Sequence, residues 1–277
     1  MPFLPLRKVP ESPVRTLADQ WLEEIRSGLA NPNTDRSELC RRALTAIYYP
    51  EYAADRWDSA VNDESIPAAT RLALAAMDPR NITLEPEYYG DVDAERFQRV
   101  KPLLWLWYSF DRSPIGGQNV WLGVELRRML APYIFKRVGK NFKAFQFVEF
   151  SFGYNLEVGD DVVIHRHVLL DDRGGIRIGN KVSISDYANI YSHTHSIVDQ
   201  KDVTDAVTRL DDGVRITYHA TVLAGVHVNE EGMVGAVAVA TKDVRPFHVN
   251  VGIPAKSVRV KPNAPHGPVD VTTVKPR

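Results

Sequence analysis

The sequence predicts a mainly β fold: a solenoid wound as a triangular prism and preceded by an α-helical region. Two observations carry this prediction. Apolar residues recur at helical spacing before residue 140, and every six residues after it. The length of 277 residues, with 44% apolar and 25% charged residues, suits one or two ordinary globular domains. We expect an α-helical region over residues 1–140, the solenoid over 141–262 and a tail over 263–277.

Composition excludes several classes of protein. The net charge of −1 gives no basic excess, so a nucleic-acid partner is not expected. The single cysteine, Cys40, excludes a disulfide framework and a multi-cysteine metal site. The N-terminus carries early prolines and no apolar segment typical of a signal peptide. The longest apolar run, residues 103–108, is far shorter than the roughly 20 residues that span a bilayer. We expect a soluble, cytoplasmic protein without membrane contact.

The first helices are predicted from apolar spacing and from capping residues. Leu17 and the apolar residues that follow it at intervals of four share one helix face, and Ser12-Pro13 is a favourable start for that helix. Asp35 with Glu38 three residues later is similar to a capping box, and an apolar stripe continues behind it. These patterns predict two amphipathic helices near the N-terminus.

Further helices are expected over residues 66–77, 94–110 and 120–136. Asp78-Pro79 should end the first of them, and Pro102 should break or kink the second. The aromatic run over residues 103–108 is expected in the core, with a subunit interface or a membrane-surface anchor as alternatives. The whole region is interpreted as a packing domain.

The second half shows two apolar columns with a period of six. The first column is Val158, Ile164, Leu170, Ile178, Ile184, Ile190, Ile216, Val222, Val228 and Val234. The second is Leu156, Val162, Val168, Ile176, Val182, Ala188, Val214, Ala220, Val226, Gly232 and Ala238. The register slips at Gly174-Gly175 and again over residues 194–213, which we expect to form a long loop. A chain that wraps a prism needs one short strand per side and one turn per corner, so three hexads make one coil.

Several motifs in this half resemble those of one known family. Val158-Gly159-Asp160, Ile178-Gly179-Asn180 and Val234-Gly235-Ala236 are similar to the repeats of hexapeptide-repeat acyltransferases, and residues 240–244 with 252–256 resemble the C-terminal signature of that family. The resemblance is strongest to the galactoside, maltose and xenobiotic O-acetyltransferases and covers residues 141–262. It implies a left-handed parallel β-helix, a homotrimer and transfer of an acyl group from coenzyme A.

His195 is the candidate general base. Transfer of an acyl group to a hydroxyl needs a group that accepts the hydroxyl proton, and a neutral imidazole suits this at neutral pH. Counted without a gap from Ile178-Gly179, His195 falls where the resemblance places the catalytic histidine, and it lies where the hexad register ends. His193, two residues earlier, is expected to support the site or to contact the acceptor. His165 and Asp172 fall near acceptor-binding positions of the family.

The resemblance also implies residues that bind acetyl coenzyme A. Ala224 and Ala236, each next to a glycine, offer small surfaces against which a long cofactor can lie. Lys242, Lys256 and Arg259 fall where the family places its phosphate contacts, and cations suit phosphate. Thr241 belongs to the same signature, and Tyr218 stands where relatives often have a small hydroxyl residue. No metal is expected.

Two alternatives belong to other classes of protein. The gamma-class carbonic anhydrases share the prism and bind zinc through three histidines at a trimer interface, and this half contains His165, His167, His193, His195 and His219. A non-catalytic trimeric scaffold is the other alternative. The position of His195 favours an acyl-coenzyme-A-dependent O-acyltransferase, with acetyl transfer to a sugar or saccharide hydroxyl as the expected reaction and N-acetylation of an amino sugar as its nearest variant.

Overall fold

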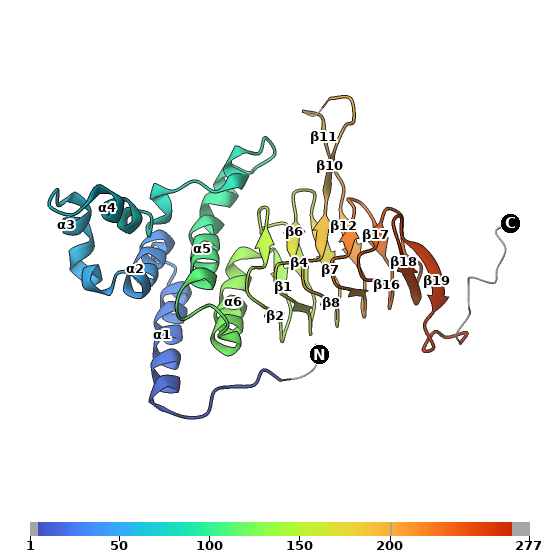
Figure 1. Ribbon diagram of the computed structural model, residues 1–277, viewed down its shortest axis with the longest axis horizontal. Coiled ribbons are helices and arrows are strands. Elements are labelled where there is room, and N and C mark those ends of the chain that lie inside the picture. The colour runs from blue at the N-terminus through green and yellow to red at the C-terminus, as the bar shows by residue number, and fades with distance from the viewer. Residues whose placement is uncertain (1–4, 200, 268–277) are drawn as a thin grey trace. The chain divides into compact units, whose positions relative to one another are not determined.

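The computed structural model describes residues 5–199 and 201–267. The chain divides into two compact units, one spanning Leu6–Ile134 and the other beginning at Phe135 (Figure 1). The first unit is helical, and the second is a solenoid of short parallel strands, which confirms the mainly β fold with a helical N-terminal region. Among the described residues, we find no helix with the length and apolarity needed to cross a membrane.

The helical unit follows the capping signals closely. Its helices are α1 (Pro13–Ala30), α2 (Arg36–Tyr48), α3 (Trp57–Asn62), α4 (Ala68–Ala75), α5 (Ala94–Arg112) and α6 (Val120–Ile134), with short 3-10 turns η1 (Pro50–Tyr52), η2 (Ala54–Arg56), η3 (Pro79–Asn81) and η4 (Glu85–Tyr88). Ser12 caps α1 by accepting from the Arg15 amide, and Asp35 caps α2 by accepting from two amides of the first turn. A side-chain oxygen thus satisfies amides that have no partner within the helix.

Helix α5 is not broken at Pro102, the first of the two expected outcomes. The helix continues from Ala94 to Arg112 with the proline inside it. The aromatic run that follows Pro102 lies in the core as predicted, because Leu103 and Trp107 are fully buried. Burial on both sides of the proline stabilises the continuous helix, although the ring removes one backbone hydrogen bond.

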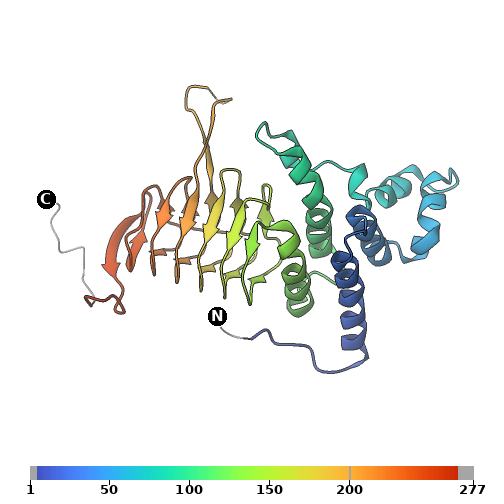
Figure 2. The ribbon, with the colours of Figure 1, turned by 180° about the vertical axis from the view of Figure 1, so that it is seen from behind.

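The solenoid consists of three sheets of mainly parallel strands, and Figure 2 shows the strands following one another along the solenoid. The first sheet contains β1 (Arg137–Val138), β4 (Leu156–Val158), β7 (Ile176–Ile178), β12 (Thr208–Leu210) and β15 (His227–Val228). The second contains β2 (Lys143–Ala144), β5 (Val163–Ile164), β8 (Ser183–Ile184), β13 (Arg215–Ile216), β16 (Met233–Val234), β18 (His248–Val251) and the antiparallel β19 (Lys256–Val260). The third contains β3 (Glu149–Phe150), β6 (Leu169–Asp171), β9 (Asn189–Tyr191), β14 (Thr221–Val222) and β17 (Val239–Ala240).

Both predicted columns point into the prism. Every residue of the first column is at most 4% exposed, and the second column is buried as well. The interior is therefore a continuous stack of aliphatic side chains, one layer per coil. Burial of this apolar area stabilises a fold whose strands are only two or three residues long.

The structure corrects the extent of the solenoid in two places. Its first strand begins at Arg137, inside the segment expected to be helical. The long loop expected over residues 194–213 is instead a hairpin followed by β12, which returns to the first sheet at Thr208. Thr208 fills an aliphatic position, and its hydroxyl donates to the Tyr191 carbonyl at 2.6 Å. Because Thr208 is polar, the sequence did not show that the hexad pattern starts again at this residue.

Three corners join the sheets, and we name each by its main feature. The capped corner, between the first and second sheets, is represented by residues 159–161, and the aromatic corner, between the second and third, by residues 165–167. The hairpin corner, between the third and first sheets, is represented by residues 171–175. Equivalent residues of the other coils stack above and below each of these.

Side-chain oxygens tie neighbouring coils together at the capped corner. The Lys140 amide donates to Asp160 Oδ1 at 2.7 Å, and the Asp160 amide donates to Asn180 Oδ1 at 2.8 Å. Gly159 is needed beside these contacts, because a Cβ there would lie 2.7 Å from the Gly179 carbonyl group. The glycine of Val158-Gly159-Asp160 thus leaves room for the backbone of the next coil.

Asp172 plays a similar capping role inside the hairpin corner. Its carboxylate is fully buried and accepts hydrogen bonds from the amides of Phe152, at 2.7 Å, and Asn155, at 3.0 Å. Burial raises the pKa of Asp172 to about 6, and the backbone hydrogen bonds oppose this rise only in part. The group holds the corner of the preceding coil in place.

We expect Asp172→Asn to change how stability depends on pH. The folded-state pKa of Asp172 is about 6 and the ordinary value of an aspartate is 3.8, so the folded protein retains a proton at Asp172 that the unfolded chain releases between about pH 4 and pH 6. As pH rises through that window, the contribution of Asp172 to the free energy of unfolding therefore falls, by roughly 3 kcal/mol in total. Denaturant unfolding across the window should show the unfolding free energy of the wild type falling relative to that of the variant. Parallel curves would contradict the prediction, and Glu149→Gln, an exposed carboxylate, is the control.

Candidate active site

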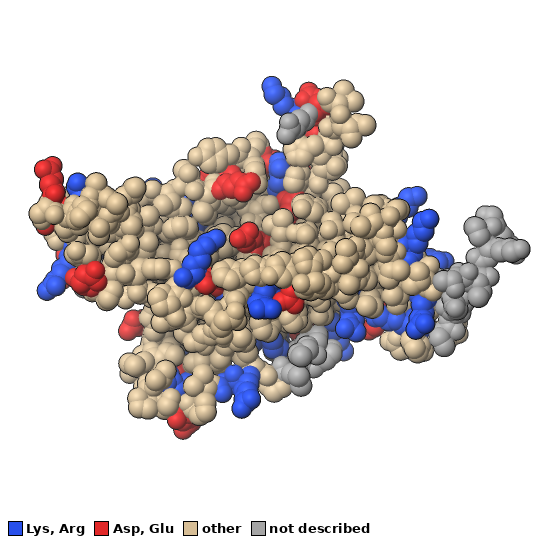
Figure 3. All heavy atoms as spheres, in the orientation of Figure 1, with Lys and Arg blue, Asp and Glu red and all other residues tan. Residues whose placement is uncertain are grey.

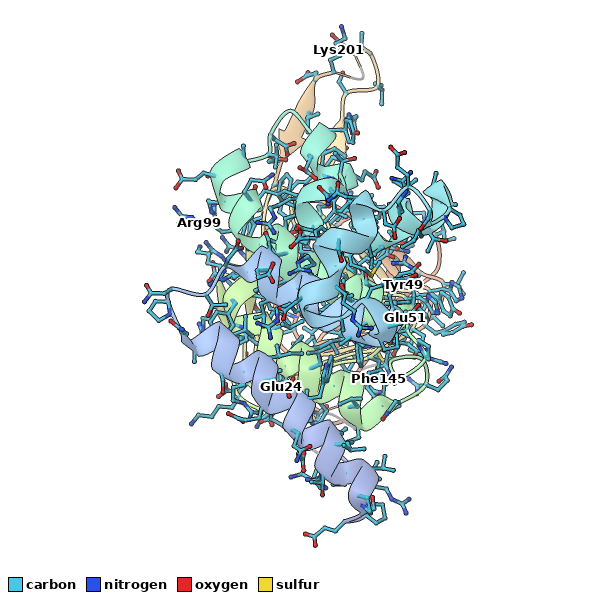
Figure 4. The ribbon with its side chains drawn as sticks, turned by 90° about the vertical axis from the view of Figure 1, so that its left-hand side faces the viewer. Glu24, Tyr49, Glu51, Arg99, Phe145 and Lys201 are labelled. Carbon is cyan, nitrogen blue, oxygen red and sulfur yellow. The ribbon has the colours of Figure 1, made fainter. Side chains whose placement is uncertain are left out.

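An antiparallel hairpin leaves the solenoid at the hairpin corner between β9 and β12. Its strands are β10 (His193–His195) and β11 (Val203–Asp205), with His193 opposite Asp205 and His195 opposite Val203. The hairpin projects away from the coils in Figures 1 and 2, and Lys201 lies near its tip in Figure 4. Both candidate histidines therefore lie where the hairpin leaves the solenoid.

Ser192 anchors the start of this hairpin. Its buried hydroxyl donates to the Asp171 carbonyl at 2.5 Å and accepts from the Gly174 amide at 2.9 Å. The Ser192 carbonyl in turn accepts from the Ala206 amide at 2.8 Å, which closes the base of the hairpin. The two ends of the hairpin are thus fixed to the coil that precedes them, so the histidines extend from a rigid base.

His193 is held by a buried carboxylate. Its Nδ1 hydrogen-bonds to Oδ2 of Asp171, a side chain that is only 3% exposed. The other carboxylate oxygen, Oδ1, accepts from the Ser151 hydroxyl at 2.7 Å. Because an ionised carboxylate only accepts, Nδ1 of His193 carries the proton of this hydrogen bond. The contact fixes both the tautomer and the plane of the His193 ring.

His195 lies next to His193 but opens to solvent. The two rings meet edge to face, with centroids 5.2 Å apart and planes at 83°. His195 is exposed, whereas His193 is partly buried. The site thus presents one imidazole fixed by a carboxylate and a second that can meet a substrate, an arrangement suited to proton transfer.

Of the two adjacent aspartates, Asp171 and not Asp172 contacts the histidine pair. Asp172 points into the corner and is fully buried, so its role as an acceptor contact stays a prediction that its burial does not support. Sequence reasoning passed over Asp171 and Ser151. Alternation along β6 was the available signal, because Leu170 belongs to the inward column and the next side chain of a strand, that of Asp171, lies on the opposite face, where the structure buries it.

His165 lies at the aromatic corner, on the other side of the third sheet from the histidine pair. Its ring stacks on Phe145 with centroids 5.0 Å apart and planes at 5°. Burial lowers the pKa of His165, and the carboxylate of Asp186, 4.0 Å from Nδ1, opposes that shift. Within one chain, the structure does not bring His165 together with His193 and His195.

Tyr218 and Ala236 belong to the aromatic corner as well. Here Phe147, His167, Tyr187 and His219 form a ladder of stacked rings with centroids 4.7 to 4.9 Å apart. Tyr218 packs edge-on against Tyr187 and His219 and is 49% exposed. Ala236 is exposed at the equivalent corner of the next coil. Sequence reasoning did not foresee this ladder, because it scored only aliphatic positions.

The other predicted cofactor residues follow the hairpin corner toward the C-terminus. Ala224 lies one coil beyond the hairpin, and Thr241 and Lys242 lie one coil further, each coil adding about 4.8 Å. Lys256 and Arg259 are exposed on β19, the last strand of the second sheet. Figure 3 shows Lys and Arg side chains gathered around this end of the solenoid.

Comparison with known proteins identifies the family. No family model matches the chain. It is 26% identical over 140 residues to the galactoside O-acetyltransferase of Escherichia coli K12, covering 49% of this chain and 69% of that protein. It is 30% identical over 156 residues to an Escherichia coli dTDP-4-amino-4,6-dideoxy-D-glucose acyltransferase, and the match covers 45% of this chain and 81% of that protein. A crystal structure of a Vibrio cholerae hexapeptide-repeat acetyltransferase with acetyl coenzyme A matches with a TM-score of 0.53 at 22% identity. This match covers 66% of this chain and 97% of that one.

These likenesses and the stacked hexads define an acyltransferase of the left-handed β-helix class. The chain belongs to the hexapeptide-repeat acyltransferase family. The resemblance found in the sequence is thereby confirmed, together with the fold class. Among the described residues, no group of three His, Cys, Asp or Glu side chains is arranged to hold a metal ion.

Proposed function

We propose that the protein transfers an acetyl group from acetyl coenzyme A to a hydroxyl of a sugar or saccharide, with His195 as general base. The exposed imidazole of His195 beside the carboxylate-bound His193 is the observation that carries this proposal. The two relatives named above act, by their names, on a galactoside and on a dTDP-linked amino sugar, which favours a carbohydrate acceptor.

His195 acts at two points of the proposed reaction. It takes the proton of the acceptor hydroxyl as that oxygen attacks the thioester carbonyl, and a carbon–oxygen bond forms. It then returns the proton to the departing sulfur as the carbon–sulfur bond breaks, so the products are an acetyl ester and free coenzyme A. Holding acceptor and thioester against the same corner supplies much of the remaining rate by proximity.

The hairpin corner offers a path for coenzyme A. From the histidine pair, the path passes Ala224 and reaches Thr241 and Lys242 two coils later. Small side chains permit close approach of a pantetheine chain, and the exposed cations Lys242, Lys256 and Arg259 suit its phosphates. In this arrangement the thioester lies at His195 and the nucleotide at the C-terminal end of the solenoid.

A homotrimer would complete the site. His165, Tyr218 and Ala236 line the aromatic corner, whereas the histidine pair lines the hairpin corner. A threefold arrangement that places the aromatic corner of one copy against the hairpin corner of the next joins both groups. Ile197 and Val198 of the hairpin are 102% and 91% exposed, which favours their burial against a neighbouring copy.

We expect acetyl coenzyme A to release free thiol when the protein is given a carbohydrate acceptor. A panel of galactosides, maltose-type sugars, amino sugars and nucleotide-linked sugars, followed with a thiol reagent, would identify the acceptor class. His195→Ala should reduce kcat by about 10²–10⁴-fold, the usual contribution of a general base, while its fold and coenzyme A affinity remain.

His193→Ala is the matched control for this prediction, because it removes the neighbouring imidazole of the same strand. The decrease in kcat of His193→Ala should be smaller than that of His195→Ala. An inactive His193→Ala with an active His195→Ala would reverse the assignment. If none of the acceptors in the panel gave thiol release with the wild-type protein, the proposed reaction itself would be overturned.

Phosphate recognition can be tested separately. Lys242→Ala or Lys256→Ala should raise the KM for acetyl coenzyme A with little change in kcat, since contacts to the nucleotide are equal in the ground and transition states. Lys140→Ala, a substitution at the distant capped corner, should leave this KM unchanged. If the KM were unaltered in both Lys242→Ala and Lys256→Ala, the nucleotide of coenzyme A would not bind at these lysines.

The trimer makes a prediction of its own. Sedimentation at micromolar concentration should show three copies, and Val198→Asp should weaken the assembly because it introduces a charge on an apolar hairpin surface. Leu72→Asp, at an exposed apolar residue of α4, is the control and should have no such effect. A stable monomeric wild type would contradict the proposal.

A further inference from the structure

The contacts around His193 resemble those of a positioning device more than those of an acceptor site. Its ring is enclosed between the buried carboxylate of Asp171 on one side and the edge-on ring of His195 on the other. An acceptor contact would need an accessible polar atom, yet Nδ1 of His193 is already bonded to Asp171 and the side chain is only 16% exposed, so Nε2 is the one ring nitrogen that Asp171 does not hold.

Four residues from three successive coils form this series of contacts. Ser151 donates to Asp171, Asp171 accepts from His193, and the His193 ring packs against His195. Asp171 and Ser151 are both buried, and the Ser192 hydroxyl fixes the backbone between Asp171 and the hairpin. The position of the His193 ring is therefore determined by the solenoid rather than by the exposed hairpin.

The charges around His193 and His195 allow these contacts to influence a proton transfer at His195. Asp171 supplies a buried negative charge, whose field is weakly screened by solvent. Two further charged residues belong to the same region: Asp205 lies opposite His193 on β11, and Arg173 follows Asp171 by two residues in the hairpin corner. A positive charge that forms on His195 during the reaction lies one imidazole away from the Asp171 carboxylate.

We propose that Asp171 and His193 form a positioning pair for His195. The carboxylate fixes the His193 ring, and that ring holds the His195 imidazole in its reactive orientation while the carboxylate stabilises the positive charge that His195 gains. This inference rests on the proposed function, in which His195 is the base. His193 and Asp171 touch neither the acceptor nor the thioester in this scheme.

A purely structural role makes a different prediction. If His193 only satisfied the buried carboxylate of Asp171, any side chain with a donor in the place of Nδ1 would serve. His193→Asn supplies such a donor without the ring that contacts His195. This variant therefore separates support of the fold from positioning of the base.

The experiment compares His193→Ala, His193→Asn and Asp171→Asn with the wild type. Steady-state kinetics use thiol release with the acceptor identified by the panel, and circular dichroism melting checks the fold. We expect all three variants to lose about 10- to 100-fold in kcat, with the KM for acetyl coenzyme A unchanged. His193→Asn should recover the melting temperature of the wild type but not its kcat.

The pH dependence of kcat gives a second readout. Asp171→Asn removes the negative charge that favours a protonated base, so the acidic limb of its profile should move to lower pH by about half a unit to one unit. Glu149→Gln, which removes an exposed carboxylate one coil earlier, should leave the limb in place.

Two results would overturn the positioning pair. One is recovery of wild-type kcat in His193→Asn while His193→Ala stays slow, because that shows a structural role only. The other is an acidic limb that moves equally in Asp171→Asn and Glu149→Gln. Failure of the proposed function is recognised differently, by a His195→Ala variant that keeps wild-type kcat.

Discussion

The solenoid depends on corner residues whose backbone lies in the left-handed region. Asp161, Tyr187 and Val237 have φ values of 58°, 62° and 62°, and each donates its amide to a corner carbonyl one coil earlier, at 2.8, 3.0 and 2.9 Å. This conformation is costly for residues with a side chain, most of all for a β-branched valine. Hydrogen bonds between coils offset the cost, so turns and sheets stabilise one another.

Most of the solenoid could be predicted from the sequence, because its core repeats. A buried position every six residues needs only an aliphatic side chain, and Ile164, Ile184 and Ile216 state the pattern directly. The prediction was wrong where the repeat was filled differently. Thr208 replaces an aliphatic residue and satisfies its hydroxyl with a carbonyl, so the return of the chain to the first sheet was not visible.

The candidate site was harder to predict because its contacts join different coils. Asp171 and His193 are 22 residues apart and meet only once the coils are stacked. The histidines themselves could be named as candidates from the sequence, since they follow a recognisable repeat. Their partners were not named, because the contact between Asp171 and His193 forms only between neighbouring coils, and alternation along β6 was the one signal that distinguished Asp171 from Asp172.

The hairpin has a further consequence for how such an enzyme can change. Side-chain contacts at the capped corner join residues 20 positions apart, yet Asn180 and Asp212 make the same contact across 32 positions. The additional chain leaves and rejoins at a single corner, and the strands on either side keep their register. Insertions at a corner therefore leave the stack of coils unaltered. A solenoid of this kind separates the part of the chain that must remain constant from the part that is open to variation in length and composition.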